Sequence, residues 1–301
     1  MTEALVELDA QYRQLREECG LVEREFGLLV VSGAEAAEYL QGQLTNDVEV
    51  LEPGQVAYAA LLDRKGHMQA DMRVLRPGEG PELWLLLEPE GLAAASRHLQ
   101  MYKIGREVEV SDASDDYALL SLIGPRATEI ARAVEATSLR TGEGVDLVVP
   151  VAEREQISET LRGAGAVDVS PEAAEIVRIE AGRPRFGAEM GTATMPAEAG
   201  IVEGAVSFTK GCYIGQETVA RLHYKGKPNR HLRGLRFRGS AQPGELLLLG
   251  EKEVGTVGSV ALSPAFGPIG LAILRREAEP GATVAVGEDG VTAEVVALPF
   301  G

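Results

Sequence analysis

The hydrophobic residues of this chain recur with two periods, one typical of helices and one typical of strands. Leu5, Leu8, Tyr12 and Leu15 lie three or four residues apart, which predicts an amphipathic helix over residues 4–18. Helical spacing predicts further helices at residues 32–40, 91–102, 125–136, 153–162 and 171–181. Apolar and alternating runs predict strands at residues 21–31, 55–62, 67–76, 82–88, 117–123 and 145–151. Hairpin-paired strands interspersed with helices indicate the α+β class.

Three short polar segments predict where these elements begin and end. Ser32-Gly33-Ala34-Glu35 matches a capping box and predicts the start of the helix that ends at residue 40. Residues 41–47 are polar and turn-prone, which predicts a compact turn outside the core. Residues 63–66 read Asp-Arg-Lys-Gly and predict a four-residue hairpin loop. The chain has no Gly-x-Gly-x-x-Gly pattern, so nothing indicates a Rossmann unit.

The pattern changes after about residue 230, where no further helix is predicted. Short strands alternate there with Gly and Pro turns, which is typical of a small barrel or sandwich. The predicted strands lie at residues 232–237, 245–249, 253–262, 269–274, 283–286 and 292–297. The sequence therefore predicts two regions, residues 1–230 and residues 231–301.

Charge and cysteine content exclude several functional classes. The chain has 301 residues, with 46 acidic and 29 basic side chains and a net charge of −17. So acidic a surface argues against general nucleic-acid coating. The two cysteines, Cys19 and Cys212, are too few for a disulfide framework, and the four histidines show no metal-ligand spacing. The acidic N-terminus does not resemble a signal peptide and no apolar run reaches membrane length, so we expect a cytoplasmic protein.

The segment with the densest candidate chemistry is residues 210–217. Cys212 lies between two glycines and two residues after Lys210, and positive charge near a thiol raises its thiolate fraction. The alternative is a buried cysteine in a turn, which is the commoner arrangement. His223 is eleven residues further on, and nothing in the sequence brings it to the thiol as a base. A cysteine-protease interpretation is therefore weak.

A basic strip follows directly, because seven of the eighteen residues from Arg221 to Arg238 are Lys or Arg and none is acidic. Such a strip could attract an anion with a few carboxylates or phosphates. It could equally be a solvated connector paired with the acidic surface. Two isolated carboxylates, Asp71 in a predicted strand and Glu189 after a Gly-rich segment, are further candidates, although either could be a surface residue.

With these segments the sequence resembles a known family, the YgfZ-type folate-binding proteins, which are relatives of the glycine-cleavage T-protein (aminomethyltransferase). Four segments carry the resemblance in order along about two-thirds of the chain. They are residues 39–47 with 53–55 and the hairpin containing Gly66, residues 179–190, residues 196–200, and residues 210–217. The signature residues of the last segment are Lys210, Gly211, Cys212, Tyr213, Gly215, Gln216 and Glu217.

The resemblance implies a ring-like arrangement of interleaved α+β lobes around a tetrahydrofolate site, with a small C-terminal β-barrel. It implies that Glu189 holds the pterin ring, that Asp71 takes a catalytic or folate-binding role, and that Arg221 and Asn46 contact folate. The implied cofactor is tetrahydrofolate or a one-carbon derivative, with no metal bound by the protein alone. The T-protein has an acidic pair where this chain reads Ala70-Asp71, and the sequence leaves open which acid is retained.

Two departures from the T-protein pattern favour one relative over the other. The aminomethyltransferase has a carboxylate where this chain has Cys212, and one acid of the pair is missing. Acid–base transfer needs such groups. The interpretation is therefore a folate-dependent accessory factor for assembly or repair of iron–sulfur proteins, including tRNA-modifying enzymes. The alternatives are a tetrahydrofolate-dependent aminomethyltransferase and a thiol sensor acting through Cys212.

The partners that this interpretation implies are folate and iron–sulfur client proteins. It implies no direct contact with nucleic acid or membrane, and a monomeric chain. A cluster usually takes four thiolates, so Cys212 could supply at most one ligand to a shared cluster.

Overall fold

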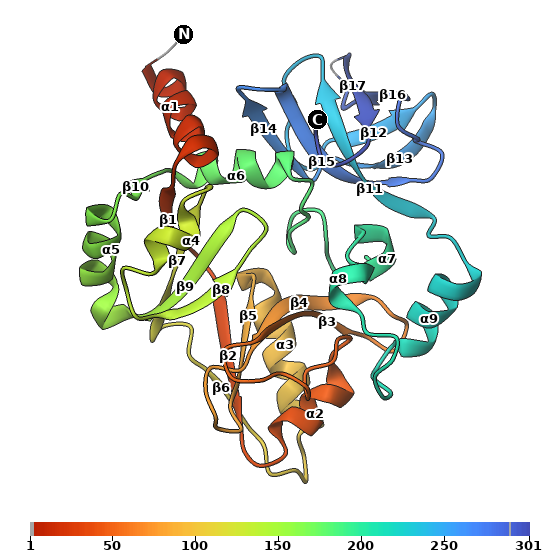
Figure 1. Ribbon diagram of the computed structural model, residues 1–301. Helices are drawn as coiled ribbons and strands as arrows, with labels where there is room; N and C mark the ends of the chain where they lie inside the picture. The colour runs from red at the N-terminus through yellow and green to blue at the C-terminus, as the bar shows by residue number, and fades with distance from the viewer. Residues whose placement is uncertain (1–2, 289) are drawn as a thin grey trace.

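The computed structural model of the chain describes residues 3–288 and 290–301. Its strands form three sheets that lie around the middle of the molecule (Figure 1). The two sheets of the N-terminal region are mixed with helices, whereas the C-terminal sheet has none in its described part. This arrangement confirms the mixed α+β class.

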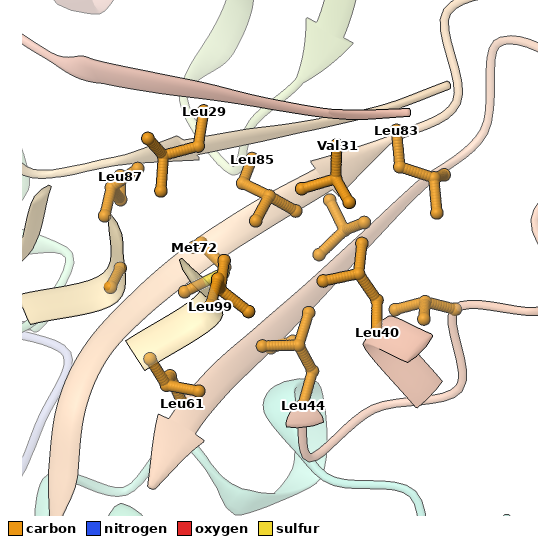
Figure 2. Close-up of a cluster of buried hydrophobic side chains, with 14 of the residues drawn as sticks. Leu29, Val31, Leu40, Leu44, Leu61, Met72, Leu83, Leu85, Leu87 and Leu99 are labelled. Carbon is orange, nitrogen blue, oxygen red and sulfur yellow. The ribbon is translucent and has the colours of Figure 1, made fainter. Parts of the chain in front are cut away.

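The first sheet is antiparallel, with the strand order β3-β4-β5-β2-β6. Its strands are β2 (Gly27–Ser32), β3 (Val56–Leu62), β4 (Met68–Leu75), β5 (Leu83–Leu87) and β6 (Glu109–Asp112). Helices α2 (Ala36–Gln43) and α3 (Pro89–Tyr102) bury one face of this sheet. Figure 2 shows the leucines that fill the space between them, among them Leu40 of α2, Leu99 of α3 and Leu85 of β5.

The second sheet has the order β10-β1-β7-β9-β8, and only its β1–β10 pair is parallel. Its strands are β1 (Gly20–Arg24), β7 (Tyr117–Ile123), β8 (Thr137–Arg140), β9 (Gly144–Pro150) and β10 (Val167–Asp168). Helices α4 (Ala127–Ala131) and α5 (Arg154–Gly163), the latter preceded by the 3-10 turn η1 (Val151–Glu153), pack on it around Leu120, Leu147 and Leu161.

The third sheet contains seven antiparallel strands in the order β13-β12-β16-β17-β11-β15-β14. The strands are β11 (Arg230–Phe237), β12 (Leu246–Leu249), β13 (Lys252–Thr256), β14 (Ser259–Ser263), β15 (Gly267–Arg275), β16 (Thr283–Val286) and β17 (Val291–Val296). The sheet curls so that β13 packs against β15 (Figure 1), and since its end strands β13 and β14 are not paired with each other, it forms a half-barrel open along one side.

Helix α1 (Glu3–Glu17) precedes the first strand. Along the chain, the second and third sheets are connected by α6 (Pro171–Glu180), α7 (Pro196–Ala199), α8 (Val202–Ala205) and α9 (Gln216–Lys225). Helices α1 and α6 pack against each other through Tyr12, Leu15 and Ile176. Among the described residues, no helix has the length and apolar character needed to cross a membrane.

The predicted strand at residues 21–31 is wrong, because this run contains two strands that belong to different sheets. Strand β1 pairs with β7 and β2 pairs with β5, so the chain crosses from one sheet to the other at Glu25 and Phe26. Both strands are largely buried, and the charged residues Glu23, Arg24 and Glu25 that separate their apolar stretches lie where the chain leaves the first of them. Strand β1 thus pairs with residues about a hundred positions further along the chain, which interleaves the two sheets.

Three other predicted boundaries also differ. Ser32 ends β2, and α2 begins after Glu35 without a side-chain cap, because the Glu35 carboxylate accepts a hydrogen bond from the backbone N–H of Glu107. Helix α4 ends at residue 131 rather than 136. The predicted strand 253–262 breaks at Gly258, where a Cβ would lie 2.9 Å from Cγ of Glu189. Close packing of Glu189 against the sheet therefore requires glycine there.

Candidate functional site

A large cavity lies in the middle of the molecule, where the three sheets meet. Its volume is about 1220 Å³, above the range of about 300–1,000 Å³ usual for small-molecule pockets. Strands β1, β4, β5, β7 and β9 contribute to its wall, together with α6, the segment after it, and Leu232 and Leu298 of the C-terminal region. Eight carboxylates and six arginines line it. The arginines are Arg24, Arg73, Arg140, Arg178, Arg183 and Arg185.

Asp71 lies in this cavity on strand β4. One carboxylate oxygen, Oδ2, accepts a hydrogen bond of 2.6 Å from the hydroxyl of Tyr58 on β3. The other, Oδ1, is buried and accepts no hydrogen bond from the part of the chain that the structure describes. Burial raises the pKa of Asp71, while the Tyr58 hydroxyl and Arg73 act in the opposite direction. A buried carboxylate with one unpaired oxygen leaves an acceptor for a ligand donor.

The neighbouring residue, Ala70, points to the opposite face of β4. Successive side chains of a strand alternate between faces, and Ala70 is fully buried in the core beneath α3. There its Cβ lies only 2.9 Å from where a Cβ on Gly91 would be. Of the two positions that are acidic in the T-protein, position 71 is therefore the one whose side chain reaches the cavity. A carboxylate at position 70 would face the core.

Arg73, two residues after Asp71 on the same strand face, connects the first sheet to the second. Its Nη1 is 2.5 Å from Oδ2 of Asp146 on β9, and Oδ1 of Asp146 accepts from the Ser121 hydroxyl on β7. Asp146 is almost fully buried. This ion pair fixes the two sheets on either side of the cavity and places a positive charge near Asp71.

The six arginines differ in how fully protein carboxylates already bind them. Arg73, Arg178 and Arg183 pair with buried or half-buried carboxylates. Arg24 and Arg185 make only long contacts, 3.6 Å to Glu88 and 3.7 Å to Glu175. Arg140 forms no ion pair within residues 3–288 and 290–301. The positive groups most available to an anionic ligand are therefore Arg24, Arg140 and Arg185.

Glu189, the sequence candidate for the pterin contact, does not line the cavity. Its carboxylate is fully buried, and Oε2 accepts from Nη1 of Arg178 at 3.2 Å and from the backbone N–H of Arg185 at 3.0 Å. Arg178 and Arg185 themselves line the cavity. Glu189 therefore lies behind these two arginines and orients the segment that carries them.

Asn46 and Lys210 are structural in this geometry. The amide of Asn46 donates to the backbone carbonyls of Tyr58 and Gly204. The buried ammonium of Lys210 donates to three backbone carbonyls, at 2.6 Å to Gln41, 2.8 Å to Leu44 and 2.8 Å to Asn46. Two of these carbonyls follow the end of α2 and one belongs to its last turn, so the ammonium caps this helix. Burial lowers the pKa of Lys210 to about 8, against the effect of the nearby carboxylates Asp47 and Glu49.

The Lys210 ammonium is directed into backbone carbonyls instead of toward the Cys212 thiol, and the predicted activation of Cys212 by its charge stays a prediction. The segment predicted as a turn outside the core is also partly core, because Leu44 and Thr45 are fully buried. Cys212 itself is exposed and does not line the cavity, whereas Cys19 is fully buried and burial raises its pKa to about 11.

The remaining signature residues position this loop. Tyr213 is buried against the β3–β4 hairpin and α9. Gly215 has a φ of +86°, and a Cβ there would lie 2.6 Å from the carbonyl oxygen of Asp63. Only glycine satisfies both conditions. Gln216 begins α9, and Glu217 forms an exposed pair with Arg221.

Arg221 and the basic strip do not reach the cavity either. The Arg221 side chain is 71% exposed on α9. Further along the strip, Arg230 is bound to Glu198 of α7. His223 stacks on Phe208, with ring centroids 4.0 Å apart. Of the predicted folate-contacting residues, the structure thus brings only Asp71 into the cavity.

Sequence reasoning missed Tyr58 and Arg73, the partners of Asp71. Both could have been found from the hairpin. A loop at residues 63–66 sets the register in which Tyr58 pairs with Arg73 and Ala60 pairs with Asp71. Tyr58 is then the diagonal neighbour of Asp71 on one face, within reach of a long side chain.

The fold and site define an α+β protein in which three sheets enclose a charged, ligand-sized cavity. Comparison with known proteins identifies the family to which the chain belongs. Residues 4–143 match the model of the GCVT N-terminal domain, and residues 230–300 match that of the glycine cleavage T-protein C-terminal barrel domain. The chain belongs to the glycine-cleavage T-protein family.

Relatives from two branches of this family are similar to the chain to the same degree. An aminomethyltransferase of Rubrobacter xylanophilus is 30% identical, over 98% of this chain and 88% of the relative. The tRNA-modifying protein YgfZ of Klebsiella pneumoniae is also 30% identical, over 92% and 91%. The crystal structure of aminomethyltransferase T from Bartonella henselae has a TM-score of 0.85 at 23% identity, covering 98% and 89%, and shares the fold.

Proposed function

We propose that the protein binds tetrahydrofolate in the central cavity and serves as an accessory factor for assembly or repair of iron–sulfur proteins, including tRNA-modifying enzymes. The observation that carries the folate site is Asp71, whose buried Oδ1 has no partner among the described residues of a cavity large enough for the ligand. Membership of the T-protein family supports the same ligand.

The cavity offers groups that suit both ends of a folate. The guanidine-like edge of a pterin donates two parallel hydrogen bonds, which a carboxylate accepts. Asp71 supplies such a carboxylate, because Oδ1 has no partner among the described residues and Oδ2, which accepts from Tyr58, has a second lone pair. Arg24, Arg140 and Arg185 would take the glutamate carboxylates, since they are the cavity arginines with the weakest protein pairing. When bound, tetrahydrofolate carries a one-carbon unit on its nitrogen atoms.

The accessory role is supported by the position of the signature loop. Cys212 is exposed outside the cavity. Its thiol is therefore available to another molecule instead of to a folate buried among the sheets. The YgfZ relatives are named as tRNA-modifying proteins, which fits a factor that acts through such enzymes.

A calorimetric titration with tetrahydrofolate tests the binding site. We expect wild type and Arg221→Ala to bind equally, and Asp71→Ala to bind at least about tenfold more weakly through loss of a charged hydrogen bond. Glu251→Gln, which removes an exposed carboxylate in the C-terminal half-barrel, is the matched control. Absence of binding to wild type would contradict the proposal, as would equal affinity for Asp71→Ala.

Aminomethyl transfer is the second candidate, and the geometry of the acidic pair favours it. Position 70 faces the core, so the missing acid removes no group from the cavity, and the carboxylate that reaches the cavity is present. A transferase releases ammonia when given an aminomethylated carrier protein and tetrahydrofolate. We expect ammonia to be released no faster with the protein than without it. Release that depends on Asp71 would instead show that the protein is an aminomethyltransferase.

The thiol-sensor alternative predicts a different behaviour. A sensor would react at Cys212 and signal without folate. We expect instead that Cys212→Ser and Asp71→Ala both lower the activity of iron–sulfur enzymes in cells that depend on this protein. A defect with Cys212→Ser alone would favour the sensor.

A further inference from the structure

The signature loop forms one exposed surface together with helix α9 and the β3–β4 hairpin. The hairpin and the helix are in contact, since a Cβ on Gly66 would lie 3.0 Å from Cβ of Thr218. A Cβ on Gly215 would lie 2.6 Å from the carbonyl oxygen of Asp63 in the same hairpin. We name this surface the α9 face. Its exposed or half-exposed members are Arg64, Lys65, Phe208, Cys212, Arg221, His223, Tyr224, Lys225 and Lys227.

Aromatic rings are packed together on the α9 face. Phe208 and His223 stack with an interplanar angle of 21°, and Tyr224 meets both rings edge-on at 5.8 and 4.8 Å. Tyr224 is nevertheless 67% exposed. Exposed aromatic side chains next to cations are enriched at protein interfaces.

The charge of the α9 face is opposite to that of the molecule. The chain carries −17 overall, yet this face holds five Lys or Arg side chains. Arg221 and Lys225 lie one turn apart on α9, on the side of Thr218 that meets the hairpin. The carboxylates nearby are Glu217, which is paired with Arg221, Asp63, which bonds the hairpin's own backbone, the exposed Glu203, and Asp47 and Glu49 near Lys210. Four of the five cations, all except Arg221, form no ion pair within the part of the chain that the structure describes and remain open to an anionic partner.

We propose that the α9 face docks an acidic segment of a partner protein and presents Cys212 to it. Charge complementarity selects an anionic partner. A protein is favoured over RNA for two reasons. The Cys212 thiolate can attack a disulfide of a partner protein, forming a mixed disulfide and releasing the other sulfur as a thiolate, or share a metal ion with a partner's thiolate, and RNA offers neither group. A nucleic acid would also extend beyond five cations onto an acidic surface that repels phosphate. The inference rests on the proposed accessory role and names the surface through which it acts.

Fluorescence anisotropy with three labelled ten-residue probes tests the docking surface: an oligoglutamate peptide, a serine–glycine peptide and oligouridine. We expect the acidic peptide to bind in a salt-sensitive manner. Lys225→Glu/Lys227→Glu should weaken it at least about tenfold, since two attractive charges become repulsive. Arg238→Glu/Lys252→Glu changes the net charge equally on exposed C-terminal sites and should leave the affinity unchanged.

A second measurement reports whether Cys212 lies within the same field. The thiolate attacks a disulfide reagent, forming a mixed disulfide and releasing one reagent thiolate. The anionic reagent dithiobis(nitrobenzoate) should react faster, relative to neutral dithiodipyridine, in wild type than in Lys225→Glu/Lys227→Glu. Cys212→Ser gives the background from buried Cys19.

Each outcome decides the proposal. Tighter binding of oligouridine, equal binding of the serine–glycine peptide, no binding of the acidic peptide, or an unchanged reagent ratio in the charge-reversed variant would overturn it. Tetrahydrofolate titration of the same variant should match wild type. Failure of docking is thereby separated from failure of the folate site.

Discussion

Replacing Lys210 by methionine separates two roles for the first residue of the signature segment. In the sequence, Lys210 reads as a cation that activates Cys212. In the structure its ammonium binds the carbonyls of Gln41, Leu44 and Asn46 at 2.6–2.8 Å. Methionine keeps the apolar stem but removes both the three donors and the positive charge, so the variant reports on each role through a different measurement.

The magnitude follows from those three bonds. Each buried carbonyl left unpaired costs about 1–3 kcal/mol, and removing the ammonium recovers part of the several kcal/mol that its burial costs. We expect Lys210→Met to lower the free energy of unfolding by about 3 kcal/mol. For 301 residues at about 2.1 cal/mol/K each, cooperative unfolding would shift Tm downward by about 5 °C.

Calorimetry and thiol alkylation read out the two roles in one variant. Lys210→Met should lower Tm while the alkylation rate of Cys212 at neutral pH stays that of wild type. Cys19 is the internal control, because its 0% exposure makes it react only when the fold opens. An unchanged Tm combined with several-fold slower alkylation of Cys212 would refute the capping argument and restore the activation hypothesis.

Three further changes test other parts of the structure. Burial raises the pKa of Asp71, so the stabilising contribution of this group is present below its ordinary pKa and is lost as the pH rises through the raised value. In urea titrations, Asp71→Asn should therefore be more stable than wild type at pH 7, and the difference should be smaller near pH 4. Gly215→Ala should lose about 2 kcal/mol or more through its positive φ and close contact, whereas Gly211→Ala, with open space around it, should stay within about 0.5 kcal/mol in the same assay. Asp146→Ala should cost about 3 kcal/mol, because it leaves Arg73 without its carboxylate between the two sheets; equal stability would show that the pair does not join them.

The geometry divides the sequence motifs of this chain between two places. Asp71 belongs to the cavity, where a folate would be enclosed between the sheets. Cys212 belongs to the outer surface, next to α9. The signature segment that carries Cys212 is held in place by Lys210 and Gly215, which both contact backbone atoms of the N-terminal region. Folate binding and partner docking are therefore open to separate mutation.

The sequence by itself determined the local elements and the class. Periodicity placed α1, the β3–β4 hairpin, and the strands after residue 230, because these depend on alternation and turn residues within a short segment. It also showed Asp71 as a polar residue in an apolar strand. These features depend on residues close together in the sequence, so a short segment is enough to predict each of them.

Only the tertiary structure decided which residues share a site. The run at residues 21–31 consists of two apolar stretches separated by Glu23, Arg24 and Glu25, and the sheet that each stretch joins depends on partners more than fifty residues away. Glu189 and Arg221 both have the charge that a folate site needs, but one is bound behind Arg178 and the other lies on an exposed helix. Charge and motif are written along the chain, whereas the direction in which a side chain points depends on packing between distant segments.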